Sequence, residues 1–303
     1  MEKFDIIIIG AGPAGMTSAL NCLRAGKTVL ILESENFGGQ IAFSPRVENF
    51  PTYPKISGAE LMDKLYEQIV EWGARVELEC ATNVEKTQDC FIVTTDYSQY
   101  ECYSVILATG VKPRHIGVER EEELIGKGVS YCATCDGNFY KGTDTAVVGG
   151  NAHAVSEALY LADLCETVYM LVPADSLTLS GSMKEKLDGK VNVKIIYNAK
   201  VIEIYGENKV EGLKYTVNGT ELDLHCAGIF VSVGSSPATD FIHIDGLTLD
   251  KGFIVVDETC QSSVPGLFAA GDVTNGKLKQ IVTACADGAK AGTYACAYAA
   301  TRN

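Results

Sequence analysis

The hydrophobic positions of the chain gather in short runs that are separated by longer stretches of mixed polarity. The first run, Ile6–Ile9, leads straight into the glycine turn at 10–12, and a mixed stretch separates it from a second run at Thr28–Leu32. A short apolar run that ends on glycine is typical of a buried strand, and the stretch between the two runs reads as a helix. The pattern therefore predicts a strand, a helix and a strand of the doubly wound α/β type.

The same pattern occurs a second time further along the chain. Residues 5–33 and 144–172 align without a gap at an offset of 139 residues. In the second copy the apolar runs are Ala146–Val148 and Thr167–Leu171, and the first of them again ends on glycine. Two copies at full unit length predict an α/β protein with two Rossmann-like nucleotide-binding domains.

Two stretches that contain proline interrupt the pattern after predicted strands. They are Val111–Arg114 and Gly234–Pro237, and proline does not continue a helix. Another nucleotide-type signature, Gly271-Asp272 after an apolar run, lies near the end of the sequence, so we expect the two outer parts to form one discontinuous domain. The predicted division is residues 1–112 with 240–303, and an inserted domain of residues 113–239.

Composition and charge narrow the possible partners. The 303 residues include 25 Lys and Arg against 39 Asp and Glu, a formal net charge of −14 that offers no electrostatic attraction to nucleic acid or anionic lipid. No apolar run approaches the ~18–20 residues that span a membrane. Without an export signal we expect the chain in the cytoplasm, where thiols stay reduced, so its eleven cysteines are not expected to form a disulfide scaffold.

The first glycine turn has the spacing of a dinucleotide site. Gly10, Gly12 and Gly15 form G-x-G-x-x-G directly after the first predicted strand. In this motif the first glycine permits the tight turn, the second lets the backbone approach a pyrophosphate, and the third permits close packing of helix on strand. Glu33 ends the second strand at about the ~20-residue spacing of a carboxylate that accepts from a ribose hydroxyl. These four residues predict a dinucleotide site.

A pair of cysteines carries the most specific redox signal. Cys132 and Cys135 have the spacing C-x-x-C, with Asp136 directly after them. Two thiols at this spacing can close a small disulfide ring, and the motif commonly lowers the pKa of one thiol. The alternative is half of a zinc site, but no second C-x-x-C exists and His115 and His153 are isolated. We therefore predict a redox dithiol and no metal site.

Taken together, the motifs resemble the low-molecular-weight thioredoxin reductase family of FAD-dependent disulfide reductases. They follow one another in the family's order along nearly the whole chain: GAGPAG at 10–15, Gly38-Gly39-Gln40, Val47-Glu48-Asn49-Phe50-Pro51, ILATG at 106–110, Cys132-Ala133-Thr134-Cys135-Asp136, GLFAAGD at 266–272 and Lys279-Gln280-Ile281. The resemblance implies an FAD domain built from both ends of the chain and an inserted nucleotide-binding domain that carries the dithiol.

The resemblance also implies which residues bind FAD. They are Gly10, Gly12, Pro13, Ala14 and Gly15 in the first turn, Glu33 at the ribose, Gly39, Gln40, Asn49, Thr109, Gly110, Gly271, Asp272, Lys279, Gln280 and Ile281. Gln40 and Asn49 are expected by the isoalloxazine ring, and Asp272 at the ribityl side. The helix that begins at Gln280 and Ile281 would point its positive end at the flavin, where it stabilises the negative charge that develops on reduction.

For the dithiol, the resemblance implies three catalytic roles. Cys135 would face the flavin and exchange electrons with it, and Cys132 would attack the substrate disulfide. Asp136 would move the proton that is needed when a thiolate becomes a thiol.

The second nucleotide site departs from the pattern of the first. After Gly149, Asn151 stands where backbone must approach a pyrophosphate, so its side chain would project into that approach. The offset of 139 places Val172 where Glu33 stands in the first copy, so the ribose loses its carboxylate. Family members that use NADPH carry an Arg-rich stretch here, whereas residues 172–178 contain no cation and Asp175 would repel a phosphate. We therefore predict that this site does not bind NAD(P)H tightly.

An intact flavin site and an intact dithiol then need another source or sink of electrons. The leading hypothesis is similarity to the ferredoxin-dependent flavin thioredoxin reductases, in which ferredoxin would supply electrons and thioredoxin would accept them. Two other enzymes stay open: an NAD(P)H-dependent thioredoxin reductase with an atypical site, and an FAD-dependent dithiol oxidase that uses oxygen. A non-catalytic flavin-binding signalling or structural protein is the alternative from another class.

Ferredoxins are typically acidic, so an acidic chain would need a local basic patch to receive one. The candidates are Lys112, Arg114, Lys277 and Lys279. The remaining expectations are a homodimer and no partner among nucleic acids or membranes.

Overall fold

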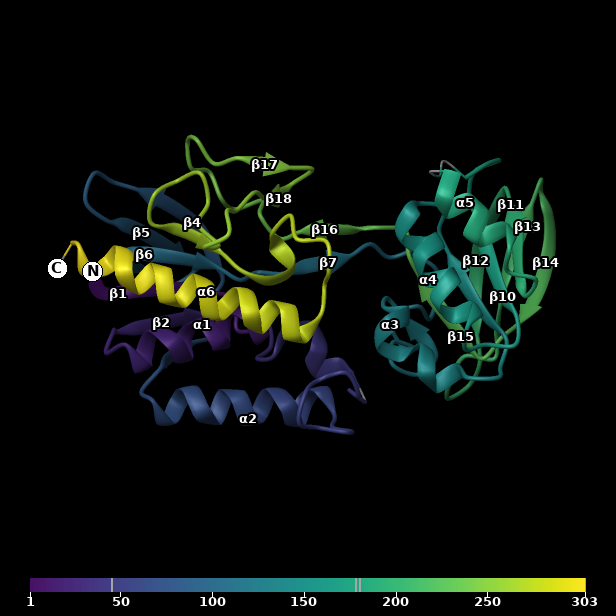
Figure 1. Cartoon of the computed structure of the whole chain (residues 1–303), viewed down its shortest axis with the longest axis horizontal. Helices are drawn as coiled ribbons and strands as arrows, with labels where there is room; N and C mark the ends of the chain where they lie inside the picture. Colours follow the sequence, from purple (N-terminus) through teal and green to yellow (C-terminus); the bar gives the residue numbers. More distant parts are fainter. Residues whose placement is uncertain (45, 178, 180, 303) are drawn as a thin grey trace. The chain divides into compact units, whose positions relative to one another are not determined.

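The structure is a computed structural model that describes residues 1–44, 46–177, 179 and 181–302 (Figure 1). The chain divides into two compact units, which we call the first unit and the second unit. The first unit comprises Met1–Lys112 and Ser236–Asn303, and the second comprises Pro113–Ser235. The two connecting segments, β7 (Val111–Pro113) and β16 (Ser235–Pro237), pair with each other.

The first unit is organised around a seven-stranded sheet. Its order is β3-β2-β1-β6-β5-β4, and β19 pairs with β6 off this path. The strands are β1 (Glu2–Ile9), β2 (Val29–Leu32), β3 (Arg75–Glu77), β4 (Ala81–Lys86), β5 (Phe91–Thr95), β6 (Gln99–Leu107) and β19 (Leu267–Ala269). β1, β2, β3, β6 and β19 pair in parallel, which buries both faces of β1 and explains its unbroken apolar run.

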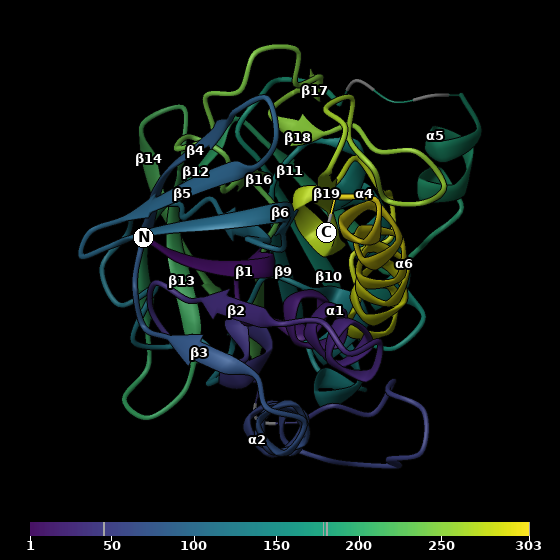
Figure 2. The ribbon, with the colours of Figure 1, turned by 90° about the vertical axis from the view of Figure 1, so that its left-hand side faces the viewer.

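Helices cover one face of this sheet. They are α1 (Pro13–Arg24), α2 (Gly58–Glu71) and α6 (Ile281–Ala300). Figure 2 shows α1 and α6 side by side. Two glycines of α6 allow this approach, because a Cβ atom at Gly288 would lie 2.2 Å from the carbonyl oxygen of Ala14 and one at Gly292 would lie 2.6 Å from that of Ser18. The remaining elements of the first unit are the antiparallel pair β17 (Leu249–Asp250) and β18 (Phe253–Ile254), and the short 3₁₀ helices η1 (Gly39–Phe43) and η3 (Gly271–Val273).

The second unit has a parallel sheet of order β11-β10-β9-β15-β8. Its strands are β8 (Val129–Ser130), β9 (Thr145–Val148), β10 (Val168–Val172), β11 (Val193–Tyr197) and β15 (Gly228–Val231). Apolar residues of α4 (Ala152–Ala162) and α5 (Gly181–Asp188) pack against one face of this sheet. Against the other face packs an antiparallel sheet of β12 (Ala199–Tyr205), β13 (Gly212–Val217) and β14 (Thr220–His225). The short helices α3 (Ala133–Asp136) and η2 (Gly137–Tyr140) follow β8.

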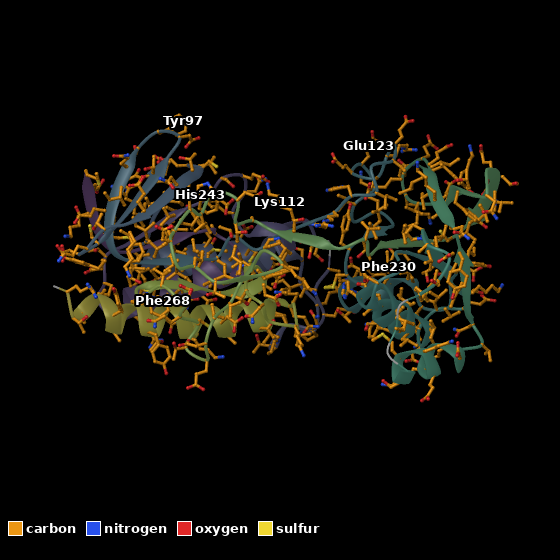
Figure 3. The ribbon with its side chains drawn as sticks, turned by 90° about the horizontal axis from the view of Figure 1, so that it is seen from above. Tyr97, Lys112, Glu123, Phe230, His243 and Phe268 are labelled. Atoms are coloured by element: carbon orange, nitrogen blue, oxygen red, sulfur yellow. A yellow bond between two sulfur atoms is a disulfide. The ribbon has the colours of Figure 1, made fainter. Side chains whose placement is uncertain are left out.

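Each unit has its own hydrophobic core. Phe268 on β19 and Phe230 on β15 are almost completely buried, and Figure 3 shows both inside their units. Parallel sheets flanked by helices confirm the predicted α/β fold. The second connection between the units lies between Ser235 and Ser236, slightly before the predicted boundary at residue 239.

Candidate active site

The carboxyl ends of four strands of the first unit lie level with one another. Ile9 of β1 pairs with Leu32 of β2 on one side and with Leu107 of β6 on the other, and Leu107 pairs with Ala269 of β19. In open α/β sheets ligands bind beyond the carboxyl ends of the strands. Segments that follow these four ends carry most of the residues predicted to bind a dinucleotide: Gly10, Gly12, Pro13, Ala14, Gly15, Glu33, Thr109, Gly110, Gly271 and Asp272.

The three glycines of the first turn have the geometry that the motif requires. Gly10 adopts a φ of 106°, and a Cβ atom there would lie 2.3 Å from the carbonyl oxygen of Ala108. At Gly15 a Cβ atom would lie 1.9 Å from the carbonyl oxygen of Gly10. A Cβ atom at Gly12 would meet no atom within 4 Å, and Gly12 caps α1 without any side-chain hydrogen bond. No side chain among the described residues therefore caps the start of α1, where Pro13 has no N–H and the groups that can bind an anion are those of Ala14 and Gly15.

The carboxylate of Glu33 lies beside this turn. Its Oε2 accepts a hydrogen bond of 2.8 Å from the backbone N–H of Ala11, and its Oε1 accepts from the next two backbone N–H groups at 2.9 and 3.0 Å. Gly39 lies on the other side of the turn, since a Cβ atom there would be 3.5 Å from the Cα atom of Gly12. The structure thus brings Glu33 and Gly39 to the glycine turn, as the sequence predicts.

Three further residues of the predicted FAD site make hydrogen bonds to other segments of the first unit. The side chain of Gln40 donates to the carbonyl oxygen of Val111. Thr109 Oγ1 donates to the carbonyl oxygen of Ala238 at 2.8 Å, and Gly110 accepts from the N–H of Ala238. Asn49 is exposed, and no hydrogen bond connects it to this group within the described part of the chain, so its place at the flavin stays a prediction.

Gly271 and Asp272 lie where α1 begins. Gly271 has a φ of 76°, and a Cβ atom there would lie 2.9 Å from the Cβ atom of Ala14. Burial raises the pKa of the Asp272 carboxyl, and the nearby Lys279 opposes that shift. Lys279 itself donates from Nζ to the carbonyl oxygens of Asp272, at 2.8 Å, and Thr274, at 2.7 Å, and burial lowers its pKa.

Gln280 and Ile281 form the beginning of α6. Gln280 is the N-cap residue, and its backbone N–H donates to Thr283 Oγ1 at 3.1 Å. Ile281 is the first helical residue. The predicted helix start is therefore present, with its positive end at these residues.

In the second unit the predicted dithiol is present as a disulfide. Cys132 and Cys135 are bonded, with 5.3 Å between their Cα atoms, and both are partly exposed. Cys132 caps α3, and its backbone N–H donates to Ser130 Oγ at 3.1 Å. Cys132 Sγ lies 3.4 Å from Thr134 Oγ1. The hydrogen bond to Ser130, at the end of β8, thus orients the backbone at the first cysteine of the dithiol.

Asp136 lies directly after the dithiol and is partly buried. Its Oδ2 accepts a hydrogen bond of 2.7 Å from Ser130 Oγ, whereas its Oδ1 atom is buried and has no hydrogen-bond partner among the described residues. Burial raises the pKa of this carboxyl, and the hydrogen bond from Ser130 only partly offsets the shift. A carboxyl that takes up a proton more readily than usual, next to two sulfur atoms, is suited to proton transfer during thiol exchange.

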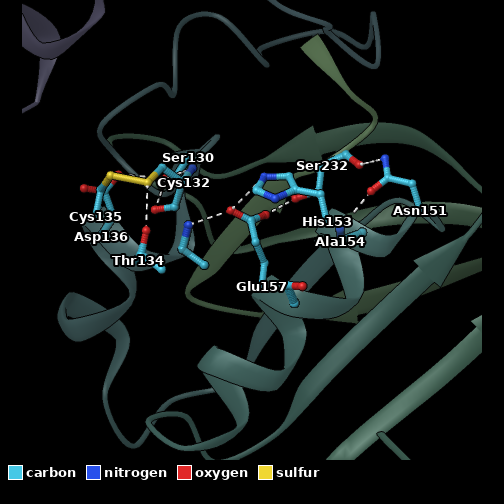
Figure 4. Close-up of polar contacts among 12 residues, drawn as sticks. Ser130, Cys132, Thr134, Cys135, Asp136, Asn151, His153, Ala154, Glu157 and Ser232 are labelled. Carbon is cyan, nitrogen blue, oxygen red and sulfur yellow. Dashed lines mark hydrogen bonds and ion pairs between the residues drawn. A yellow bond between two sulfur atoms is a disulfide. The ribbon is translucent and has the colours of Figure 1, made fainter. Parts of the chain in front are cut away.

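At the second glycine turn, the side chain of Asn151 occupies the start of the helix that follows. Gly149 adopts a φ of 149°, and Asn151 caps α4. Asn151 Oδ1 accepts a hydrogen bond of 2.9 Å from the N–H of Ala154, and its Nδ2 donates to the carbonyl oxygen of Ser232 at 2.9 Å (Figure 4). The first-turn N–H that a phosphate would use is therefore already bonded.

The strand end beside this turn offers no acceptor for a ribose. Val172 is fully buried at the end of β10, and its Cγ1 would lie 2.8 Å from a Cβ atom at Gly150. The following residues, 173–177, are described and contain no cation, and Asp175 is exposed among them. Thr178, the last residue of the stretch that we compared with the Arg-rich motif, lies outside the described residues.

Sequence reasoning missed three polar residues around the dithiol: Ser130, Glu157 and Ser232. Glu157 lies on the buried face of α4 next to Ala158 and Leu161, and only 4% of it is exposed. A glutamate at an apolar position of a helix is visible in the sequence and could have marked Glu157 as a candidate. No pattern in the sequence marks Ser130 or Ser232.

The basic residues that we considered for a docking patch differ in their surroundings. Lys279 is partly buried and its Nζ donates to two backbone carbonyl groups, so it is less accessible than the other candidates, and the basic patch stays a prediction. Lys112 pairs with Glu35 at 3.1 Å, and Lys277 is exposed before α6. Searches of the described residues find no helix that could cross a membrane and no cluster of His, Cys, Asp or Glu side chains that could hold a metal ion. The homodimer stays a prediction.

A dinucleotide cradle on one unit and a redox dithiol on the other define a flavoprotein disulfide reductase. Comparisons with known proteins support this class. The model of the pyridine nucleotide-disulphide oxidoreductase family matches residues 4–288. A thioredoxin reductase of Listeria monocytogenes is 40% identical over 298 residues, which cover 97% of this chain and 93% of that protein.

Solved structures give the same result. The thioredoxin reductase of Streptococcus pyogenes is 36% identical, with a TM-score of 0.92 and coverage of 99% of both chains. A ferredoxin-flavin thioredoxin reductase of Clostridium acetobutylicum is 34% identical, with a TM-score of 0.55 and coverage of 99% of both chains. The chain belongs to the pyridine nucleotide-disulphide oxidoreductase family, and within it to the low-molecular-weight thioredoxin reductases, which use FAD. The uncapped helix start at Gly12 and the glutamate at the end of β2 fit that cofactor.

Proposed function

We propose that this protein is a thioredoxin reductase whose electrons come from reduced ferredoxin rather than from NAD(P)H. The observation that carries the choice of donor is the side chain of Asn151, which bonds the first-turn N–H of α4 and the carbonyl oxygen of Ser232. A nicotinamide dinucleotide would have to displace this side chain before its pyrophosphate could reach the helix start.

Each nicotinamide dinucleotide lacks two contacts at the second turn. Hydrogen bonds to charged groups are worth about 1.5–3 kcal/mol each, and the pyrophosphate lacks one of them while Asn151 caps α4. Val172 supplies no carboxylate to the ribose, and residues 173–177 supply no cation to a 2′-phosphate. NADH therefore lacks the pyrophosphate and ribose contacts, and NADPH lacks the pyrophosphate and 2′-phosphate contacts. Losing two such contacts weakens nucleotide affinity by about two to four orders of magnitude.

FAD, when bound, accepts electrons singly or in pairs and so links a one-electron donor to a two-electron dithiol. In this proposal the N–H groups that follow Gly12 hold its pyrophosphate, and Glu33 accepts from its ribose hydroxyl groups. Asp272 binds beside the start of α1, and the start of α6 at Ile281 supplies a positive helix end. Gln40 and Asn49 are assigned to the ring by family resemblance alone.

The dithiol then carries out disulfide exchange with thioredoxin. Two electrons and two protons convert the Cys132–Cys135 disulfide into two thiols. The thiolate of Cys132 attacks the thioredoxin disulfide and forms a mixed disulfide, which the thiolate of Cys135 resolves by attacking Cys132 Sγ. Reduced thioredoxin leaves and the Cys132–Cys135 disulfide is restored. Asp136, with its raised pKa, gives and takes the protons of these steps.

The names of similar proteins support both the proposed electron acceptor and the proposed electron donor. Proteins named thioredoxin reductase match nearly the whole chain, which supports thioredoxin as the acceptor. Structures of the Clostridium acetobutylicum protein, named for ferredoxin and flavin, match 99% of the chain, which supports ferredoxin as a possible donor class. We also propose that the first unit is the FAD-binding domain and the second the domain that carries the dithiol.

An anaerobic mixing experiment tests the donor. Oxidised protein is mixed separately with NADPH, NADH and reduced ferredoxin while the absorbance of the flavin is followed. We expect only ferredoxin to bleach the flavin within seconds and to support thioredoxin reduction. Rapid bleaching by stoichiometric NADPH or NADH would replace ferredoxin with the nicotinamide donor, and rapid turnover of a small dithiol with oxygen while ferredoxin leaves the flavin oxidised would indicate a dithiol oxidase.

Two cysteine variants test the roles within the dithiol. Cys135→Ser is expected to abolish electron transfer from the flavin to the dithiol. Cys132→Ser is expected to abolish attack on thioredoxin but to leave Cys135 available, so a thiolate–flavin charge-transfer band can form. An exposed free cysteine of the first unit, Cys80, gives the matched control Cys80→Ser. Thioredoxin reduction at the parental rate in both dithiol variants would refute the assigned roles.

A further inference from the structure

A buried carboxylate lies directly behind the dithiol. Glu157 on α4 is 4% exposed, and its Oε1 accepts a hydrogen bond of 2.8 Å from the backbone N–H of Ala133. Its Oε2 accepts from the hydroxyl of Ser232 (Figure 4). Ala133 lies between Cys132 and Cys135, so Glu157 holds the peptide that joins the two redox cysteines.

The charge of this carboxylate is only weakly compensated. Among the described residues, its one ion-pair contact is with His153 Nε2 at 3.6 Å, and that side chain is 67% exposed. The other partners are a neutral hydroxyl and a neutral N–H. A buried negative charge with neutral partners exerts a strong field on nearby groups, because water does not screen it.

The same residues also connect the dithiol to the closed nucleotide turn. Ser232 donates its hydroxyl hydrogen to Glu157 and accepts from Asn151 Nδ2 at its carbonyl oxygen. Asn151, Ser232 and Glu157 therefore form a continuous chain of hydrogen bonds that ends at Ala133. Each member has a partner on both sides, so the carboxylate is held in one position.

We propose that Glu157 is a positioning residue for the dithiol and that its negative charge makes the Cys132–Cys135 pair more strongly reducing. The proposal rests on the proposed function only in taking this pair as the redox dithiol. Reduction adds two electrons and breaks the bond between the two sulfur atoms; it takes up two protons when both become thiols, and one proton when one sulfur atom stays a thiolate. The thiol–thiolate form carries a negative charge on a residue next to Ala133, the peptide that Glu157 holds, so the carboxylate destabilises this form, while the neutral disulfide is not affected. The charge therefore favours the oxidised form, and a dithiol that favours its oxidised form passes its electrons on more readily.

The test variant is Glu157→Gln, which removes the charge and keeps a side chain of the same size. Its amide oxygen can still accept from Ala133, and its amide nitrogen can donate to the oxygen of Ser232. The holoprotein is equilibrated without oxygen in buffers of reduced and oxidised dithiothreitol, and the thiols are alkylated and counted by mass. The measurement uses neither ferredoxin nor thioredoxin, so its outcome is independent of the proposed donor and acceptor.

At about pH 9.5, above the usual thiol pKa of about 8.5, the reduced pair carries a thiolate, and we expect the equilibrium constant for its reduction to rise about tenfold in Glu157→Gln, which corresponds to a reduction potential about 30 mV less negative. Ser232→Ala removes a hydrogen bond from the network but keeps the charge, so it should not raise this constant. Glu203→Gln on β12 removes a surface charge from the same unit and should leave the constant within twofold.

Two results would overturn the proposal. The first is a constant for Glu157→Gln that stays within twofold of the parental value or falls. The second is an equal rise in Ser232→Ala, because it would assign the effect to the lost hydrogen bond and not to the charge. A purely structural role for Glu157 predicts a lower melting temperature with no change in the constant, and thus belongs with the first result.

Discussion

The N-termini of α1 and α4 are two versions of one turn with different capping residues. Each follows the first strand of a βαβ unit, and each begins beside a glycine with positive φ, Gly10 in one case and Gly149 in the other. At α1 the cap is Gly12, which makes no side-chain hydrogen bond and faces open space. At α4 the cap is Asn151, whose side chain bonds the helix it begins.

The difference shows how one substitution changes a binding site into a structural feature. A helix start binds phosphate because its first N–H groups have no partner within the helix. Asparagine supplies that partner internally and stabilises the helix, so the site loses its ligand-binding groups while the fold keeps its shape. In the first unit no side chain of the described residues caps the helix, so its start keeps the groups that a pyrophosphate would use.

The largest effect should come from giving α1 the cap of α4. Gly12→Asn is expected to lower FAD affinity at least a hundredfold, because its side chain would take the N–H groups and the space that the pyrophosphate needs. The fold should persist, since a Cβ atom at this position meets nothing within 4 Å. The FAD content of purified protein and its affinity by titration measure the effect.

Gly26→Asn is the matched control for this variant. Gly26 follows α1, has a φ of 75° that asparagine tolerates, and has open space around it. It should retain FAD. If Gly12→Asn binds FAD as tightly as the control, the cap does not distinguish the two turns.

The reverse exchange should open the second turn in part. Asn151→Gly frees the N–H of Ala154, and one charge-assisted hydrogen bond corresponds to about a tenfold gain or more in affinity for a nicotinamide dinucleotide. The rate of flavin bleaching at a fixed low concentration of NADPH should rise accordingly. The matched control in the same unit is Asn198→Gly, at a surface position with a φ of 53°. No gain over the control would mean that Val172 and the missing cations close the site without the help of Asn151.

The pH dependence of stability also differs between the two units, because each contains a partly buried aspartate in different surroundings. Burial raises the pKa of Asp136 and that of Asp272, and Lys279 opposes the shift only at Asp272. A raised pKa in the folded state means that the folded protein holds the proton more tightly, so this stabilisation is present below the ordinary pKa of about 3.9 and is lost as pH rises through the folded-state value.

Asp136→Asn removes this titration. We expect its melting temperature, relative to the parental protein, to increase steadily as pH is raised from 4 to 7. Asp188→Asn on the exposed surface of α5 is the control for the amide substitution itself. A difference between Asp136→Asn and the parental protein that is constant over this pH range would show that the Asp136 carboxyl has an ordinary pKa.

The smallest expected effect is the change in the free energy of unfolding when each helix cap is replaced by alanine. Asn151→Ala should lower the free energy of unfolding by about 1 kcal/mol, because the N-cap hydrogen bond to Ala154 is lost. Gly12→Ala should change it by less than about 0.5 kcal/mol, since Gly12 makes no such bond. Urea unfolding of both variants without FAD gives the comparison, and equal losses would contradict the different capping of α1 and α4.

Much of the fold follows from the sequence because its signals are local. The run Ile6–Ile9 and the glycines after it determine a strand and a tight turn through periodicity and backbone conformation, which need no distant partner. The spacing of Cys132 and Cys135 is equally local, and their disulfide is present. The repeat at an offset of 139 also identified Val172 as the residue that replaces a glutamate.

Other features depend on partners that are distant in sequence. The side chain of Gln40 bonds Val111, and that of Lys279 bonds two backbone carbonyl groups. These contacts join loops that come together only when the sheet has folded. The sequence analysis named Lys279 both among the FAD-binding residues, by resemblance, and among the candidates for a basic patch, because nothing near it in the chain shows its partial burial. For the same reason the raised pKa of Asp272 could not be predicted.

The clearest division lies at Asn151. The contiguous motif and its spacing show from the sequence that a side chain stands where a glycine is needed. The partners of that side chain come from the fold. Asn151 bonds back to Ala154 and to Ser232 after β15, and Ser232 in turn bonds Glu157, which holds Ala133 of the dithiol segment. Residues 133, 151, 157 and 232 come together because parallel strands end at one edge of the sheet, where hydrogen bonds join segments that lie far apart in the chain.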